Sequence, residues 1–179
     1  MHAWDPVGDD GFSDVYSLVC ASPVGGDGVF ESPATAIPTP QWAIPSGIET
    51  QVHRDEQGDV VGDIPVPADA IKYDSTQNAW VQVGEGVTSM SKVTYSFRYG
   101  KFHHGRSIGL ADILYADAYR EEWTNKDGED DRYYDEPFSS SWKPLRETQK
   151  GWVIHPDNTI TVYIDYNFPA SKERIAETG

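Results

Sequence analysis

Two adjacent histidines, His103 and His104, are the side chains of this sequence that first suggest chemistry, because imidazole nitrogens are common metal ligands. They stand in the run KFHHGRSIGLADILYA, residues 101–116. Neighbours on a strand or a tight turn point to opposite sides, and metal ligands on a helix are usually spaced four residues apart. No Glu or Cys stands at that spacing from either histidine. The pair therefore does not predict a metal site, and we expect no cofactor.

Carboxylates are the next candidates, because they can bind calcium or act as general acids and bases. The acidic segment NKDGEDDRYYDE, residues 125–136, has its glycine too early for a calcium loop of the EF-hand type. It predicts a solvated loop, with a weak surface calcium site as the alternative. Acid pairs such as Glu121/Glu122 and Asp130/Asp131 stand in polar surroundings, where no burial tunes a carboxylate for catalysis.

Motifs of catalytic and nucleotide-binding sites are absent from the sequence. It contains no G-x-S-x-G nucleophile motif, no P-loop and no G-x-G-x-x-G. The VGEGV run at 83–87 lacks the third glycine and a following helix, so it predicts a turn. We therefore expect no enzymatic activity, and a hydrolase that uses buried carboxylates is kept as a third hypothesis.

Charge and composition restrict the partners. The chain has 29 acidic and 14 basic residues and a formal net charge of -15, which repels phosphate backbones and argues against a nucleic-acid partner. The single cysteine, Cys20, cannot form an internal disulfide and predicts a buried thiol. No run approaches the roughly 20 apolar residues of a membrane span, and the MHAWDPVGDD start lacks the features of a signal peptide. The C-terminal run SKERIAETG resembles a polar helix that is not terminated, so we expect the chain to be a fragment of a longer protein.

The candidate side chains must be positioned by the secondary structure that the sequence predicts, a series of strands and helices without regular β-α alternation. Apolar and polar residues alternate at 92–102 and again at 158–168, which predicts two half-buried strands, the first closed by an inward Phe102. Residues 110–123 predict an amphipathic helix. Its apolar stripe comprises Leu110, Ile113, Leu114, Ala118 and Trp123. Further predictions are a hairpin around EQGD (56–59), a turn before a strand with Trp80, a short helix within 137–154 and a helix that starts at Pro169. The mixture predicts an α/β fold of the mixed α+β kind.

The run from 101 to 116 is itself a strand, a tight turn and a helix start. Gly105 permits the positive φ that the turn demands, and Ser107 and Gly109 precede the helix. Asp112 falls in the first helical turn, where its carboxylate can accept from free backbone N–H groups. Each residue has a structural role, and no chemistry is required.

The same residues resemble a known family. VTYSFRYGKFHHGRSIGLADILYA is similar, without a gap, to the hallmark strand–turn–helix of extracytoplasmic solute-binding proteins of ABC transporters, of the oligopeptide/dipeptide/nickel class. His104 and the pair Leu110-Ala111 depart from the pattern. Flanking segments at 64–83 and 150–170 also resemble the family, the latter as a strand pair followed by a proline and a helix. The matching positions are Tyr95, Phe97, Arg98, Gly100, Phe102, His103, Gly105, Asp112 and Ile113.

The resemblance implies part of the N-terminal lobe of a two-lobed, periplasmic-binding-protein-like fold. Residues 1–62 correspond to an irregular and strand segment of that lobe, residues 63–179 to its strand–turn–helix subdomain, and the second lobe is absent. Members of the class capture a solute by hinge closure between lobes. In the family the N-terminal segment passes near the cleft between the lobes, which implies ligand contacts for Trp4, Asp5 and Phe12. The alternative is that Trp4 is a core residue.

The function that the resemblance implies is the substrate-binding component of an ABC importer. It captures peptides or a similar solute outside the membrane, as a monomer without cofactor, and delivers them to membrane permease subunits. The location implied is extracytoplasmic, periplasmic or at the cell surface. The alternative is an extracellular carbohydrate-binding or adhesion module, which the aromatic content and the loops rich in Pro and Gly would suit.

Overall fold

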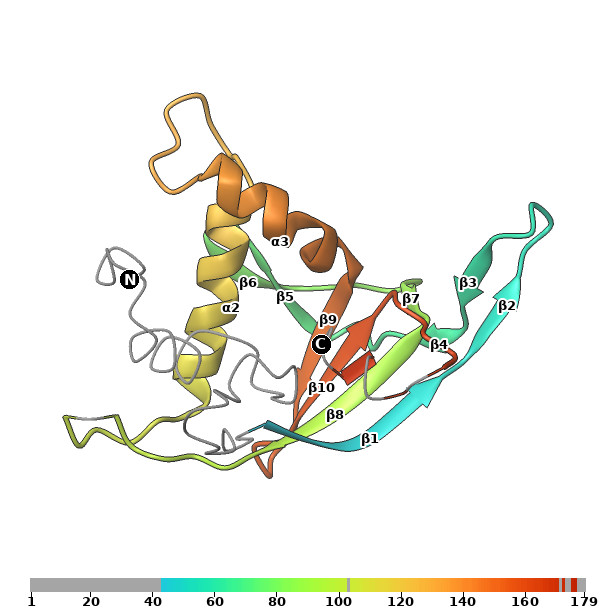
Figure 1. Cartoon of the computed structure of the whole chain (residues 1–179), viewed down its shortest axis with the longest axis horizontal. Coiled ribbons are helices and arrows are strands. Elements are labelled where there is room, and N and C mark those ends of the chain that lie inside the picture. Colours follow the sequence, from blue (N-terminus) through green and yellow to red (C-terminus); the bar gives the residue numbers. More distant parts are fainter. Residues whose placement is uncertain (1–42, 103, 171, 173–174, 177–179) are drawn as a thin grey trace, which may run out of the picture.

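The structure is a computed structural model that describes residues 43–102, 104–170, 172 and 175–176. Its main feature is a sheet of six antiparallel strands in the order β1-β8-β10-β9-β5-β6 (Figure 1). These strands are β1 (Ala43–Thr50), β5 (Ile71–Asp74), β6 (Ala79–Gln82), β8 (Ser91–Phe97), β9 (Gln149–Ile154) and β10 (Ile160–Ile164). Two short ribbons pair β2 (Val52–Arg54) with β3 (Val60–Gly62), and β4 (Ile64–Pro65) with β7 (Thr88–Ser89). Two long helices, α2 (Leu110–Thr124) and α3 (Glu136–Thr148), complete the described elements. The α+β prediction is confirmed.

The central strand β10 has a covered surface on both sides of the sheet. All five of its residues are buried. Ile160, Val162 and Ile164 join the core under the N-terminal half of α2, together with Ile175 and Ala176. On the opposite side, Tyr163 packs in a second core with Ile64, Val66 and Ala70 near the β4–β7 ribbon. A strand buried on both faces needs side chains that tolerate burial at successive positions. ITVYI supplies them, because the one residue without an apolar body, Thr161, lies 2.7 Å from the hydroxyl of Thr94 and is hydrogen-bonded.

Strand β8 follows the predicted alternation only as far as Phe97. Val93 and Tyr95 are buried on the α2 side, whereas Lys92, Thr94 and Ser96 are half-buried on the other. The predicted continuation to an inward Phe102 is wrong. The ladder between β8 and β10 ends at the Ile160–Tyr95 pair, two residues before the end of β8. Residues 98–100 belong to no strand, so the chain leaves the sheet after Phe97.

The chain between β8 and α2 forms the predicted tight turn. Gly105 has a φ of +89°, and its N–H donates to the carbonyl of Phe102 over 2.8 Å. Asp112 accepts from the N–H of Gly109 over 2.8 Å, and the Arg106 guanidinium donates to the same carboxylate over 2.6 Å. His104 stacks on the ring of Phe102 at a centroid distance of 5.5 Å. These contacts confirm the structural role predicted for Gly105 and Asp112.

The remaining local predictions have mixed outcomes. The hairpin around EQGD is the β2–β3 ribbon, and Trp80 lies on β6 after a turn, as predicted. The helix predicted within 137–154 is α3, but it runs without a turn into strand β9. The strand pair implied for 150–170 is found as β9 and β10. Of the helix predicted from Pro169, residues 172, 175 and 176 are described and helical.

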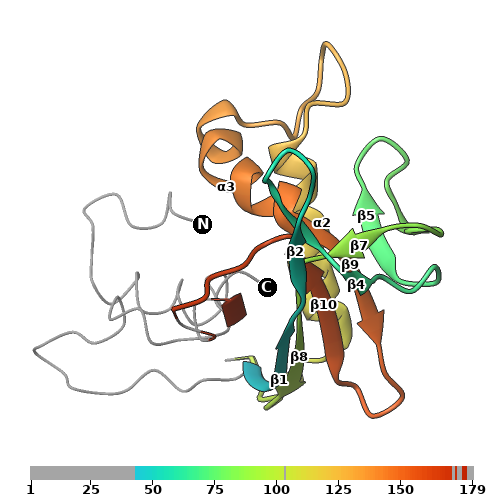
Figure 2. The same ribbon diagram turned by 90° about the vertical axis from the view of Figure 1, so that its right-hand side faces the viewer.

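The β2–β3 ribbon projects from the body of the molecule and is held at its base (Figures 1 and 2). Gly62, in β3, contacts the main chain of β7 so closely that a Cβ atom there would lie 2.1 Å from the carbonyl carbon of Ser89. The N–H of Gln51 also donates to the carbonyl of Met90 over 3.0 Å. The close approach of two backbones fixes where the ribbon leaves the sheet.

Substitution of Gly62 tests this contact. Because the added Cβ meets backbone rather than a flexible side chain, we expect Gly62→Ala to lower the free energy of unfolding by about 2 kcal/mol or more. Gly47→Ala, with nothing within 4 Å of the new Cβ, is the matched control and should change it by less than about 0.5 kcal/mol. Urea denaturation followed by circular dichroism measures both, and equal effects would contradict the close contact.

Candidate functional site

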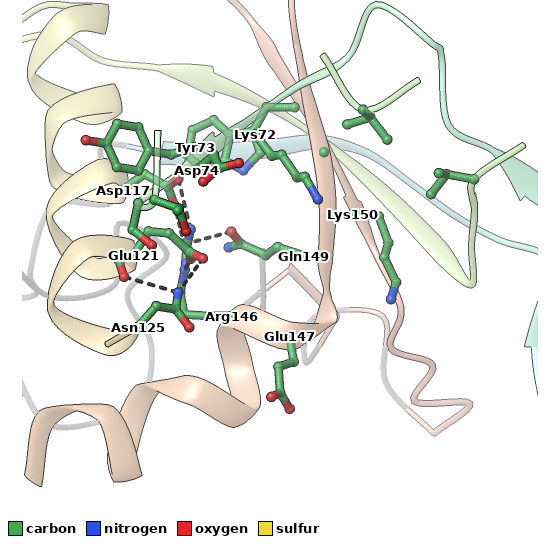
Figure 3. Close-up of a pocket in the computed structure, with 16 residues that line it drawn as sticks. Lys72, Tyr73, Asp74, Asp117, Glu121, Asn125, Arg146, Glu147, Gln149 and Lys150 are labelled. Carbon is green, nitrogen blue, oxygen red and sulfur yellow. Dashed lines mark hydrogen bonds and ion pairs between the residues drawn. The ribbon is translucent and has the colours of Figure 1, made fainter. Parts of the chain in front are cut away.

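A polar pocket opens where the main sheet splays. Strands β5 and β9 are joined by a single residue pair, Ile71–Trp152. Beyond that pair a pocket of about 510 Å³ lies between β5, α2 and the junction of α3 with β9. Its walls include Lys72, Tyr73 and Asp74 from β5; Asp117, Glu121 and Asn125 from α2 and the residue that follows it; and Arg146, Glu147, Gln149, Lys150 and Trp152 from α3 and β9 (Figure 3).

The buried guanidinium of Arg146 forms the floor of this pocket. The Arg146 side chain is 7% exposed and the Asp117 side chain 4% exposed. Two Arg146 nitrogens contact the two oxygens of Asp117, one of them (Nη2 to Oδ2) over 3.1 Å. Nε donates to Oε2 of Glu121 over 2.8 Å, and Nη1 donates to Oε1 of Gln149 over 2.8 Å. Such a two-pronged pair is the geometry in which Arg binds carboxylates most specifically.

The electrostatics keep Arg146 charged. Burial alone would lower the pKa of the Arg146 guanidinium, but the charges and hydrogen bonds of Asp117 and Glu121 outweigh it and raise that pKa. The second oxygen of Glu121, Oε1, accepts from Asn125 Nδ2 over 2.5 Å. The Arg146 guanidinium therefore keeps its charge although it is buried.

Local sequence explains how the two helices present these groups. Asp117, Glu121 and Asn125 are spaced by four residues, so they line one side of α2 and of the turn that follows it. Helix α3 begins after Asp135, whose carboxylate accepts from the N–H of Phe138 over 2.8 Å, a standard N-cap. The hydroxyl of Ser139 then donates to the carbonyl of Thr124 over 2.7 Å and ties the start of α3 to the end of α2.

In the Arg146 network the carboxylate oxygens accept hydrogen bonds from side chains of the protein itself. A general base needs a carboxylate oxygen free to take a proton. Both oxygens of Asp117 and both of Glu121 are occupied by donors of the protein itself. What the pocket can offer a ligand is the set of polar groups around this floor and the partly exposed side chains of Val83 and Val87.

The residues predicted from the sequence as ligand contacts, Trp4, Asp5 and Phe12, lie outside the described residues, and so does His103. Among the residues that the structure describes, no group of three or more His, Cys, Asp or Glu side chains is placed to hold a metal ion. Of the acid pairs, Glu121 belongs to the pocket network. In the acidic loop, Asp131 accepts from the N–H groups of Tyr133 and Tyr134, and these bonds lower its pKa.

The sequence analysis did not identify the pocket. One signal was present: Asp117 interrupts the apolar stripe of α2, seven residues after Leu110 and on the same side of the helix. A carboxylate at such a position is rarely buried without a cationic partner. The partner, Arg146, stands 29 residues further along the chain, so no local pattern links the two.

Comparisons with known proteins give no identification: no family model matches the chain, and a search of the curated proteins finds no match. In the described part of the chain, neither helix combines the length and the apolar character that crossing a membrane requires.

Removal of the Arg146 guanidinium tests the network. We expect Arg146→Met to lower the free energy of unfolding by about 3–5 kcal/mol, because Asp117 is left as an unpaired buried carboxylate. The double variant Arg146→Met with Asp117→Leu should recover much of that loss. Arg106→Met, which breaks the pair of a 63% exposed arginine with Asp112, is the control and should cost less than about 1 kcal/mol. If Arg146→Met lowered the free energy of unfolding no more than Arg106→Met does, the buried pair would not stabilise the fold.

Glu122, beside the network on α2, generates a pH prediction. Burial, followed by the charges of Asp127 and Asp131, raises the pKa of its carboxyl, and its Oε2 has no hydrogen-bond partner among the described residues. A carboxyl with a raised folded-state pKa destabilises the native state as the pH rises above the ordinary range of Glu. Glu122→Gln should therefore stabilise the protein at pH 7, by roughly 0.5 kcal/mol, and have no effect near pH 3.

Thermal unfolding at both pH values measures the effect. Glu56→Gln, at the exposed tip of the β2–β3 ribbon, is the matched control. If Glu122→Gln stabilised the protein equally at pH 7 and pH 3, the ionised carboxylate of Glu122 would not be the cause of the stabilisation.

Proposed function

We propose that this chain is part of the substrate-binding component of an ABC importer, similar to the oligopeptide/dipeptide/nickel class. In this proposal it acts outside the membrane, captures a peptide or a similar solute without catalysis, and delivers it to permease subunits. The chain supplies part of one lobe, and a second lobe completes the cleft.

The unit at residues 91–124 carries the proposal. Residues 93–116 within it resemble the family hallmark without a gap, and several of the matching positions have scaffold roles in the structure. Tyr95 donates from its hydroxyl to the carbonyl of Ala176 inside the core. Gly105 takes the positive φ, and Asp112 accepts at the start of α2. These positions form the strand, tight turn and helix start that the family pattern contains, and this agreement supports the proposal.

The alternative is an extracellular carbohydrate-binding or adhesion module. A row of aromatic side chains on α2 and α3 favours it. Tyr119 and Trp123 stack at a centroid distance of 5.1 Å, and Phe138 and Trp142 at 5.8 Å. These rings lie on the helices and outside the two cores of the sheet. The two functions differ in whether a solute crosses the membrane.

Uptake by the host tests the proposal. We expect deletion of the reading frame that encodes this chain to abolish saturable uptake of a labelled mixture of di- to pentapeptides, and the intact frame in trans to restore it. The purified product of the complete reading frame should retain peptides through gel filtration, as read by mass spectrometry. A frame with a stop codon early in the segment is the matched control.

Unchanged uptake of peptides, nickel chelates and sugar oligomers after deletion would refute the importer. If the purified product then bound polysaccharide or cell walls, the module hypothesis would take its place.

A further inference from the structure

We propose that the pocket above Arg146 binds an uncharged, polyhydroxylated solute, a mono- or disaccharide. The proposal rests on which hydrogen-bonding groups of the pocket are already engaged and on the sign of its charge. It goes beyond the importer function and does not depend on it.

A cationic ligand must compete with donors of the protein itself for the inner carboxylates of this pocket. Both oxygens of Asp117 accept from Arg146, and the oxygens of Glu121 accept from Arg146 and Asn125. Asp74 accepts from the main chain and the side chain of Gln77. Glu147 also lines the pocket but is exposed to solvent, and Figure 3 shows its side chain directed away from Lys72. A cation would have to displace a buried guanidinium to reach the inner carboxylates, which is unfavourable.

An anionic ligand meets an unfavourable potential. The pocket is lined by three basic and four acidic side chains, and the chain as a whole carries -15. The charge of Arg146 is neutralised by two carboxylates, and Lys150 pairs with Asp165 over 3.3 Å. At physiological salt, charges further away than about 8 Å are largely screened. The charges that line the pocket therefore determine how strongly it repels an anionic ligand.

The groups left over suit hydroxyls. The side-chain oxygen of Gln149 accepts from Arg146, which leaves the NH2 group of Gln149 to donate to a ligand. The NH2 group of Asn125 donates to Glu121, which leaves the side-chain oxygen of Asn125 to accept from a ligand. The ammonium of Lys72 forms no side-chain hydrogen bond or close ion pair with the described residues, although its charge contributes to the lowered pKa of Asp74. A hydroxyl both donates and accepts, so neighbouring hydroxyls can satisfy donors and acceptors together.

Shape and surface agree with a small sugar. The pocket volume of about 510 Å³ lies in the range of small-molecule sites. Val83 and Val87 line it and are partly exposed, so they offer apolar surface to the C–H face of a sugar ring. An extended peptide binds by a row of backbone groups along a strand edge. The unused groups here come instead from the ends of side chains on three elements, and they match clustered hydroxyls better than a linear row.

Nuclear magnetic resonance on the ¹⁵N-labelled chain tests the proposal. The side-chain amide of Gln149 and the indole N–H of Trp152 report on the pocket directly. We expect saturable shifts of both signals with at least one of glucose, galactose, mannose, maltose and cellobiose. The charged analogues glucuronate and glucosamine, and an N-acetylated dipeptide amide, should bind more weakly.

An isosteric variant supplies the second measurement. Gln149→Glu keeps an oxygen facing Arg146 and removes the donating NH2, so it should weaken sugar binding about five-fold, the worth of one hydrogen bond. Gln82→Glu, exposed on β6, makes the same change in charge outside the pocket and should leave the affinity unchanged.

Three results would overturn the proposal: no saturable shift with any neutral sugar, tighter binding of a charged analogue or of the blocked dipeptide, or unchanged affinity in Gln149→Glu. If the variant does not fold, the ligand series on the wild-type chain decides alone. Peptide uptake by the host can fail or succeed whatever these signals show, so the two proposals are tested separately.

Discussion

The buried contact of Arg146 with Asp117 is the interaction on which the arrangement of the helices depends. It joins the middle of α2 to the point where α3 becomes β9. The N-terminal half of α2 is held by apolar contacts of Leu110, Ile113 and Leu114, but its C-terminal half has a charged side chain facing inward. A buried carboxylate is tolerated only with a partner of good geometry, so the position of α3 is dictated by the need to bring Arg146 to it.

This constraint also explains why the sheet opens where it does. Strands β5 and β9 pair at one position, and the side chains of the network line the pocket beside that pair. The result is the polar pocket above Arg146, which lies beside the two apolar cores of the sheet. Pre-organised polar groups of this kind bind a ligand with little loss of conformational freedom.

The two features that bear on function lie at opposite ends of α2. The turn around Gly105, which carries the family resemblance, precedes its first residue, and the Arg146 pocket lies beside its second half (Figures 1 and 3). The turn is a scaffold element whose residues are occupied by their own backbone contacts. Any ligand contact in the described part of the chain is therefore better sought beside Asn125 and Gln149 than at the two histidines with which the sequence first suggests chemistry.

The sequence by itself determined the elements whose cause is local. The alternation of β8, the helix from Leu110, the positive φ of Gly105 and the hairpin closed at Gly58 each follow from neighbours a few residues apart. The end of β8 at Phe97, the passage of α3 into β9, and the pocket itself were decided by tertiary structure. A strand ends where its partner strands end, and Arg146 meets Asp117 across 29 residues of chain. Such pairings depend on how distant segments fold together, because a pattern read along one segment carries no information about the segment that will lie beside it.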